Sequence, residues 1–119
     1  MSKNHFISGI TDLLILSILD SHDSYMYELI KSIADYSENL LVISQNTIYT
    51  AAYKLEREGK ISEYSKLVGK KRTRVYYHLE PKGKEYLNEL LESYQNTTAG
   101  INNIFAVLKK GVKTDEQDL

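Results

Sequence analysis

The chain has 119 residues and a net charge of −1, a length that suits one domain with an appended element and that makes an oligomer reasonable to expect. It contains no cysteine, which excludes a disulfide framework, thiol catalysis and zinc sites built on thiolates. The beginning of the chain shows no signal-peptide pattern, and the longest apolar run, Leu13 to Leu16, is too short to span a bilayer, so we expect a cytoplasmic protein with no membrane partner.

The first third of the chain predicts two helices. Residues 9–21 form a strongly apolar helix that ends in a polar turn at residues 20–23, and Ser24 begins a second helix. The buried side of the first contains Ile10, Leu13, Leu14, Ile18 and Leu19, and the inward stripe of the second contains Met26, Leu29, Ile30 and Ile33. Residues 40–43 are apolar and predict a small strand or a buried segment leading into a third helix.

Residues 44–59 form a third helix with two chemically different faces. Ser44 suits the N-cap, and Gly59 suits the left-handed residue that ends a helix. The apolar face consists of Ile48, Ala51, Ala52 and Leu55, and the second face, offset by about 200°, consists of Asn46, Tyr49, Thr50, Tyr53, Lys54 and Arg57. An ordinary solvated surface helix is the alternative.

A basic hairpin follows this helix. Residues 61–64 and 74–79 predict two strands, joined by a loop at 65–73 that contains Gly69-Lys70-Lys71-Arg72. Residues 60–85 hold eight basic and three acidic side chains, whereas residues 1–43 hold two basic and six acidic ones. The positive charge is therefore concentrated in one part of the chain, and a local basic surface is what binding to phosphates requires.

Three helices and a basic hairpin predict a winged helix-turn-helix that binds double-stranded DNA. A helix fits the major groove, where the amides of Gln45 and Asn46 can pair with adenine, and cations of a β-ribbon neutralise phosphates without recognising sequence. The predicted DNA-contacting residues are Ser44, Gln45, Asn46, Thr47, Tyr49, Thr50, Tyr53, Lys54, Lys70, Lys71, Arg72 and Arg74. The alternatives are a solvated turn at 70–72 and a packing role for Tyr49 and Tyr53.

The closing segment predicts a long helix that pairs with a second copy of the chain. Apolar or small residues recur at alternating steps of three and four, which is the spacing of a coiled-coil seam. The predicted dimer interface is Leu87, Leu90, Tyr94, Thr97, Ile101, Ile104 and Leu108. Packing of this stripe against the first helix of the same chain is the alternative. Thr97 and Gly100 weaken the middle of the seam, so a pocket near Tyr94 is expected between subunits.

Two runs resemble the PadR family of bacterial transcriptional regulators. They are NTIYTAAYKLEREGKI in the third helix and RVYYHLEPKGKEYL after the hairpin, and the resemblance extends over roughly residues 8–108. The matching residues are Thr47, Tyr49, Leu55, Glu56, Gly59, Tyr76, Tyr77 and Gly83. The short closing part resembles the smaller subfamily with one long C-terminal helix. Two positions depart from the pattern, since Glu80-Pro81 replaces a helix-capping threonine and Tyr94 replaces a ligand-stacking tryptophan.

The resemblance implies a homodimeric repressor that binds a palindromic operator and that, in some members, a small planar or phenolic effector releases. Tyr94 is the effector-binding candidate. We thus expect a mainly α fold with a small β-hairpin, made of a winged helix-turn-helix at 1–80, a dimerisation helix at 81–110 and a disordered tail at 111–119. No cofactor, metal site or enzymatic activity is predicted, because the histidines show no ligand spacing and no nucleophile motif occurs. A winged-helix protein-interaction module that does not touch DNA is the alternative function.

Overall fold

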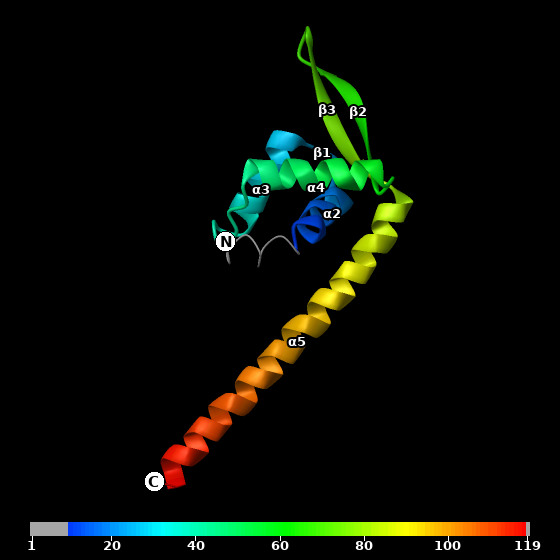
Figure 1. Ribbon diagram of the computed structural model, residues 1–119. Coiled ribbons are helices and arrows are strands. Elements are labelled where there is room, and N and C mark those ends of the chain that lie inside the picture. Colours follow the sequence, from blue (N-terminus) through cyan, green and yellow to red (C-terminus); the bar gives the residue numbers. More distant parts are fainter. Residues whose placement is uncertain (1–9, 119) are drawn as a thin grey trace. The chain divides into compact units, whose positions relative to one another are not determined.

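The computed structural model describes the backbone of residues 10–118 and the side chains of residues 10–109. Gly9, His5 and the last residue of the predicted tail lie outside the described residues. The chain divides into two compact units, one up to Leu87 and one from Asn88 onward. Among the described residues, the first unit contains three helices, a sheet and the beginning of a further long helix, and the second unit is the continuation of that long helix (Figure 1).

The first unit is built around α2 (Thr11–Ser21), which contacts α3 (Met26–Tyr36), α4 (Gln45–Arg57) and a strand of the sheet. Because neighbours surround it, Ile15 and Leu16 are fully buried although they lie outside the predicted stripe of this helix. The core of the described chain also contains Leu13, Ile18, Leu19, Leu29, Ile33, Ile43, Ile48, Ala52, Leu55, Ile61 and Leu87. The predicted apolar face of the third helix therefore packs inward, except that Ala51 is only half-buried.

The sheet has three antiparallel strands rather than the two of the predicted hairpin. Strands β2 (Ile61–Val68) and β3 (Arg72–Leu79) form the hairpin that projects beyond α4 (Figure 1), and β1 (Ser24–Tyr25) pairs with the other edge of β3. The prediction that Ser24 begins a helix was wrong by two residues, because Ser24 and Tyr25 pair with Tyr77 and Tyr76. A two-residue strand carries no periodic signal, so only this long-range pairing defines it.

The hairpin strands are longer than predicted. Residues 65–68 and 72–73 are paired, so only residues 69–71 form the turn, where Gly69 has a φ of 71°. A three-residue turn that ends in a paired strand commonly needs one left-handed residue, which glycine adopts without strain.

Residues 40–43 form no strand among the described residues, which corrects one of the two predicted alternatives. Glu38 and Asn39 adopt left-handed conformations at the end of α3, and the chain then crosses to α4 without a partner strand. Leu40 is 86% exposed, whereas Ile43 is buried. The segment is thus an open connection with one anchoring side chain.

Helix α5 (Pro81–Asp118) begins inside the first unit and continues through the second. It extends past residue 110, where the sequence predicted a disordered tail, and the structure assigns helix as far as Asp118. The domain limits 1–80, 81–110 and 111–119 otherwise remain predictions.

Candidate nucleic-acid interface

Hydrogen bonds within α4 fix its first turn. The Ser44 hydroxyl accepts a hydrogen bond from the Thr47 backbone N–H at 3.1 Å, and the two hydroxyls lie 2.7 Å apart. This confirms Ser44 as the N-cap. The Thr50 hydroxyl donates to the backbone carbonyl of Asn46 at 2.9 Å. The hydroxyls of Ser44, Thr47 and Thr50 are therefore engaged within the helix, whereas the other polar side chains of its outer face are free to reach a ligand.

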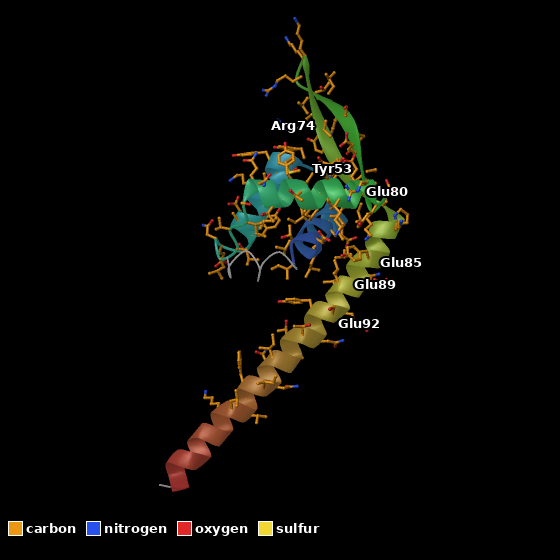
Figure 2. All side chains as sticks on the ribbon, viewed as in Figure 1. Tyr53, Arg74, Glu80, Glu85, Glu89 and Glu92 are labelled. Carbon is orange, nitrogen blue, oxygen red and sulfur yellow. The ribbon has the colours of Figure 1, made fainter. Side chains whose placement is uncertain are left out.

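The outer face of α4 is open to solvent. Tyr49 is 50% exposed and Tyr53 is 64% exposed, so neither is a core aromatic. The Arg57 guanidinium lies over the Tyr53 ring, 5.5 Å from its centroid, and Figure 2 labels Tyr53 on this helix. Gln45, Asn46 and Lys54 are exposed as well. The predicted second face is thus a continuous polar and aromatic surface that a major groove can accept.

The tip of the hairpin carries the predicted cations. Lys70, Lys71 and Arg72 are exposed, and within the described part of the chain none of them lies in an ion pair. The chain reverses at Gly69, so these charges project at the end of an extended two-stranded ribbon. Unpaired cations on such a ribbon are free to neutralise phosphates.

Arg74 lies further down the hairpin and has a different environment. Its guanidinium carbon is 4.0 Å from the centroid of the Tyr25 ring, and the side chain is half-buried (Figure 2 labels Arg74). Tyr25 meets Tyr76 edge-on at 5.5 Å, and Tyr76 stacks on Tyr64 at 5.8 Å with 18° between planes. One face of the sheet therefore carries an aromatic cluster that holds Arg74 in place. This cluster was not predicted from the sequence, although the alternation along β3 places Arg74 and Tyr76 on one face of the strand.

Asp23 connects the start of β1 to both strands of the hairpin. Its carboxylate accepts a hydrogen bond from the Tyr64 hydroxyl at 2.7 Å and pairs with His78 Nδ1 at 2.8 Å. Partial burial raises the pKa of the Asp23 carboxyl, but the hydrogen bonds from Tyr64 and His78 outweigh it, so the pKa lies below its usual value. His78 therefore has a structural partner within the sheet.

A pair of carboxylates joins α4 to β2. Partial burial raises the pKa of Glu56, and the hydrogen bond and negative charge of Glu63 raise it further. Tyr77 lies beside them, and its pKa is raised by burial first and then by the two glutamates. The Glu56 carboxyl therefore holds its proton more readily than an isolated one, and this contact between helix and hairpin weakens when Glu56 is ionised.

The exposed surface of α5 differs in part from the predicted seam. Tyr94, Thr97, Ile101, Ile104 and Leu108 are exposed in the single chain, and Leu90 is half-buried. Leu87 is 1% exposed within the first unit, so its side chain belongs to that core and is not accessible to a partner chain. The prediction missed Leu91, Phe105 and Val107, which are also exposed. Figure 2 shows Glu85, Glu89 and Glu92 following one side of the same helix. Helix α5 therefore has a broad unpaired apolar surface beside an acidic one.

Neither a membrane span nor a metal site is found in the described residues. None of the described helices is both long and apolar enough to cross a bilayer. A search of the same residues for three grouped histidine, cysteine or carboxylate side chains gives no candidate for a metal ion.

A helix with an exposed polar face, beside a basic hairpin and on a three-helix core, defines the winged helix-turn-helix class. A model of the family described as "Transcriptional regulator PadR-like family" matches residues 15–89. The chain belongs to this family, whose members regulate transcription and are not enzymes.

Individual relatives agree with this membership. A protein of Lysinibacillus sphaericus called "Uncharacterized protein X" is 28% identical over 113 residues, which is 95% of this chain and 100% of that protein. A transcriptional regulator from Clostridium thermocellum is 36% identical with a TM-score of 0.76, over 83% of this chain and 93% of that one. A PadR-like transcriptional regulator from Bacillus cereus is 26% identical with a TM-score of 0.75, over 85% and 96%.

One solved relative was crystallised with DNA. Bacillus subtilis PadR in complex with operator DNA is 23% identical with a TM-score of 0.62, over 69% of this chain and 47% of that one. At this identity the likeness shows a shared fold.

Proposed function

We propose that this protein is a cytoplasmic homodimeric repressor that binds a palindromic DNA operator through α4 and the β2–β3 hairpin. The observation that carries the proposal is the exposed face of α4, with Gln45, Asn46 and Tyr49 at its N-terminal half, beside hairpin cations that have no partner in the described chain. The Bacillus subtilis relative, which shares this fold, was solved in complex with operator DNA, and this supports DNA as the partner.

The two parts of this surface have different tasks. Gln45 and Asn46 carry amides that can donate to and accept from a base edge, so α4 supplies sequence recognition. Lys70, Lys71 and Arg72 carry point charges that contact phosphates of any sequence. The hairpin therefore supplies affinity, and it also accounts for the salt dependence of binding.

The proposed dimer uses the apolar surface of α5. Ile101, Ile104 and Leu108 are exposed in the single chain. Helices with apolar residues at this spacing associate because pairing buries their apolar surface. Two copies would present two copies of α4, which is what a palindromic site requires.

The proposed effector is a small aromatic molecule that binds between subunits near Tyr94 and releases the DNA. The Tyr94 ring is exposed on α5, and the neighbouring Thr97 and Gly100 are too small to fill a tight seam. Release requires that the effector bind the DNA-incompetent arrangement better than the DNA-bound one. The rival function is a protein-interaction module that does not bind DNA. Such a module would not need the hairpin cations, and this chain has them.

The experiment is selection of bound duplexes from a random pool by the full-length protein, followed by titration of the best sequence and of a scrambled duplex at about 150 mM salt. We expect an inverted repeat with half-site centres about one or two helical turns apart, at roughly 10 bp per turn. The selected duplex should bind about 10³-fold or more tightly than the scrambled one. Equal affinity for the two duplexes would contradict sequence-specific binding.

A further inference from the structure

A cavity of about 460 Å³ lies in the first unit, where α3, α4 and β3 meet. Tyr25, Tyr27 and Ile30 line it from the β1–α3 side, Gln45 and Tyr49 from α4, and Arg74 from the hairpin. Its volume falls within the range of small-molecule sites, which combine apolar and aromatic walls with a few polar groups that fix orientation. The cavity is open to solvent, and the DNA contacts proposed for Gln45, Tyr49 and Arg74 do not by themselves require a hollow between them.

Arg74 is the one charged side chain in the lining, and its charge is not neutralised. It stacks at 4.0 Å on Tyr25 and is half-buried, and no hydrogen bond or ion pair joins it to another residue in the described part of the chain. The carboxylate of Asp23, two residues before Tyr25 in the chain, is already engaged by Tyr64 and His78. Stacking leaves the N–H edge of a guanidinium available, so Arg74 is a fixed cation with free donors.

The other walls suit a flat ring. Tyr25, Tyr27 and Tyr49 bring three aromatic side chains to the cavity, Ile30 adds an apolar surface and Gln45 adds one amide. Aromatic rings pack in offset or edge-on arrangements around a planar ligand. A planar ligand with a single negative charge is therefore complementary both to the walls and to Arg74, whereas a planar cation would face uncompensated repulsion.

We propose that this cavity binds a small planar aromatic anion, such as an aromatic carboxylate, with the carboxylate on Arg74 and the ring between the tyrosines. The consequence for DNA rests on the proposed function: Gln45, Tyr49 and Arg74 are predicted DNA contacts, so the ligand and the operator compete directly. This site is separate from the proposed effector site at Tyr94, which acts through the arrangement of subunits.

The binding test is calorimetry of the full-length protein with 2-naphthoate and with 2-naphthamide, its uncharged counterpart. We expect naphthoate to bind at least tenfold more tightly, because only the carboxylate can form charge-assisted hydrogen bonds with Arg74. R74Q should abolish this preference, and R74K should retain part of it. The matched control is R57Q. Arg57 is also a cation stacked on a tyrosine, Tyr53, but neither residue lines the cavity, so this change should leave the preference for naphthoate intact. Thermal melts establish that each variant is folded.

Two results would overturn the proposal. The first is absence of naphthoate binding at millimolar concentration, or equal binding of naphthoate and naphthamide. If R74Q still weakens DNA binding in that case, Arg74 is a phosphate contact only. The second is a naphthoate preference that survives R74Q and disappears in Y94A, which would place the site on α5.

The competition test uses the duplex obtained by selection. Naphthoate should raise the apparent Kd of the operator complex in proportion to its occupancy of the cavity, and in R74Q the added compound should have no effect. An unchanged operator Kd in wild type at saturating naphthoate would refute competition. If no duplex is selected, the proposed function fails while calorimetry still decides whether the cavity binds the anion.

Discussion

Gly83 is required because the first turn of α5 lies against the backbone that follows α4. A Cβ atom at this position would overlap the carbonyl oxygen of Lys60 and would lie 2.8 Å from Leu79 Cδ1. Side chains fasten the same junction: Lys60 Nζ lies 3.7 Å from the centroid of Tyr86, whose hydroxyl donates to Asp12 at 3.2 Å. The start of α5 is therefore an integral part of the first unit.

We expect Gly83→Ala to destabilise the protein by about 1–3 kcal/mol, the usual range for an overpacked site, since the obstacle is backbone that cannot rotate away. Gly100→Ala is the matched control, because an added Cβ there meets nothing within 4 Å. That change should stabilise the helix by roughly 0.5–1 kcal/mol, because alanine has the higher helix propensity. Urea unfolding measures both free energies, and equal effects of the two substitutions would contradict the close approach at Gly83.

Two carboxyl groups of the first unit have pKa values shifted in opposite directions. The pKa of Asp23 is lowered from 3.8, so its contribution to stability is present above that value and is lost as the pH falls through the lower folded pKa. The pKa of Glu56 is raised from 4.5, so the folded protein binds that proton more tightly than the unfolded chain. Ionisation of Glu56 therefore removes stability as the pH rises through the raised pKa.

At pH 7 we expect Glu56→Gln to stabilise the protein and Asp23→Asn to destabilise it. The gain from Glu56→Gln should shrink as the pH falls below the raised pKa of that group, and the loss from Asp23→Asn should shrink only at still lower pH. Chemical unfolding of the three proteins between pH 3 and 7 measures these differences. Effects of the same sign at pH 7 would show that one of the two shifts is assigned wrongly.

At the scale of elements, α4 and the hairpin differ in how they can contact a duplex. The cations at 70–72 project from the tip of a ribbon and have no partner within the described chain. The side chains of α4 lie on a rigid helix whose opposite face is buried through Ile48, Ala52 and Leu55. Rigid placement suits recognition of bases, whereas exposed point charges suit phosphates of any sequence.

Asn46→Ala and Tyr49→Ala should therefore reduce the ratio of specific to non-specific affinity. Lys71→Ala and Arg72→Ala should weaken all duplexes alike and reduce the slope of log K against log salt by up to about 0.9 per lost phosphate contact in each half-site. Titrations of specific and scrambled duplexes at several salt concentrations separate the two effects. Lys31→Ala is the control for charge, because Lys31 already pairs with Asp35 on α3 at 3.1 Å. If the hairpin variants changed the sequence preference and left the slope of log K against log salt unaltered, the assignment of base recognition to α4 and phosphate binding to the hairpin would be wrong.

At the scale of the whole molecule, the chain leaves more apolar surface exposed than a monomer requires. Ile104 is 59% exposed and Phe105 is 62% exposed, and both lie on the part of α5 that forms the second unit. Isolated exposed side chains need no explanation, but a stripe along a helix indicates a partner. The partner that we propose is a second copy of α5, which would also account for the proposed two-fold recognition of DNA.

Ile101→Glu and Ile104→Glu should convert the proposed dimer to monomers at micromolar concentration, because a carboxylate at a dry seam is left unpaired. Both side chains lie outside the core of the first unit, so that unit should remain folded. Asn102→Glu, an exposed position off the stripe, should leave the assembly unchanged. Light scattering measures the mass, and a well-folded wild-type monomer would contradict the dimer.

Sequence alone determined the elements whose signals are local. The period of 3.6 residues and the caps at Ser44 and Gly59 defined α4, and the alternation of β3 together with the glycine-containing basic loop defined the hairpin. The faces of α4 and the family followed from the same residues, because both depend on spacing along one helix and one strand. The composition also indicated DNA binding, because the basic side chains cluster within residues 60–85.

Only the tertiary structure decided the features that depend on pairs of residues far apart in the chain. The strand β1 exists because Ser24 and Tyr25 pair with β3, and residues 40–43 are not a strand because they find no partner. The burial of Leu87 and the stacking of Arg74 on Tyr25 likewise bring together separate elements. A periodic pattern states which face of an element is apolar, but the identity of the opposing surface is a property of the folded chain, and that surface determines whether an apolar or charged side chain is already satisfied.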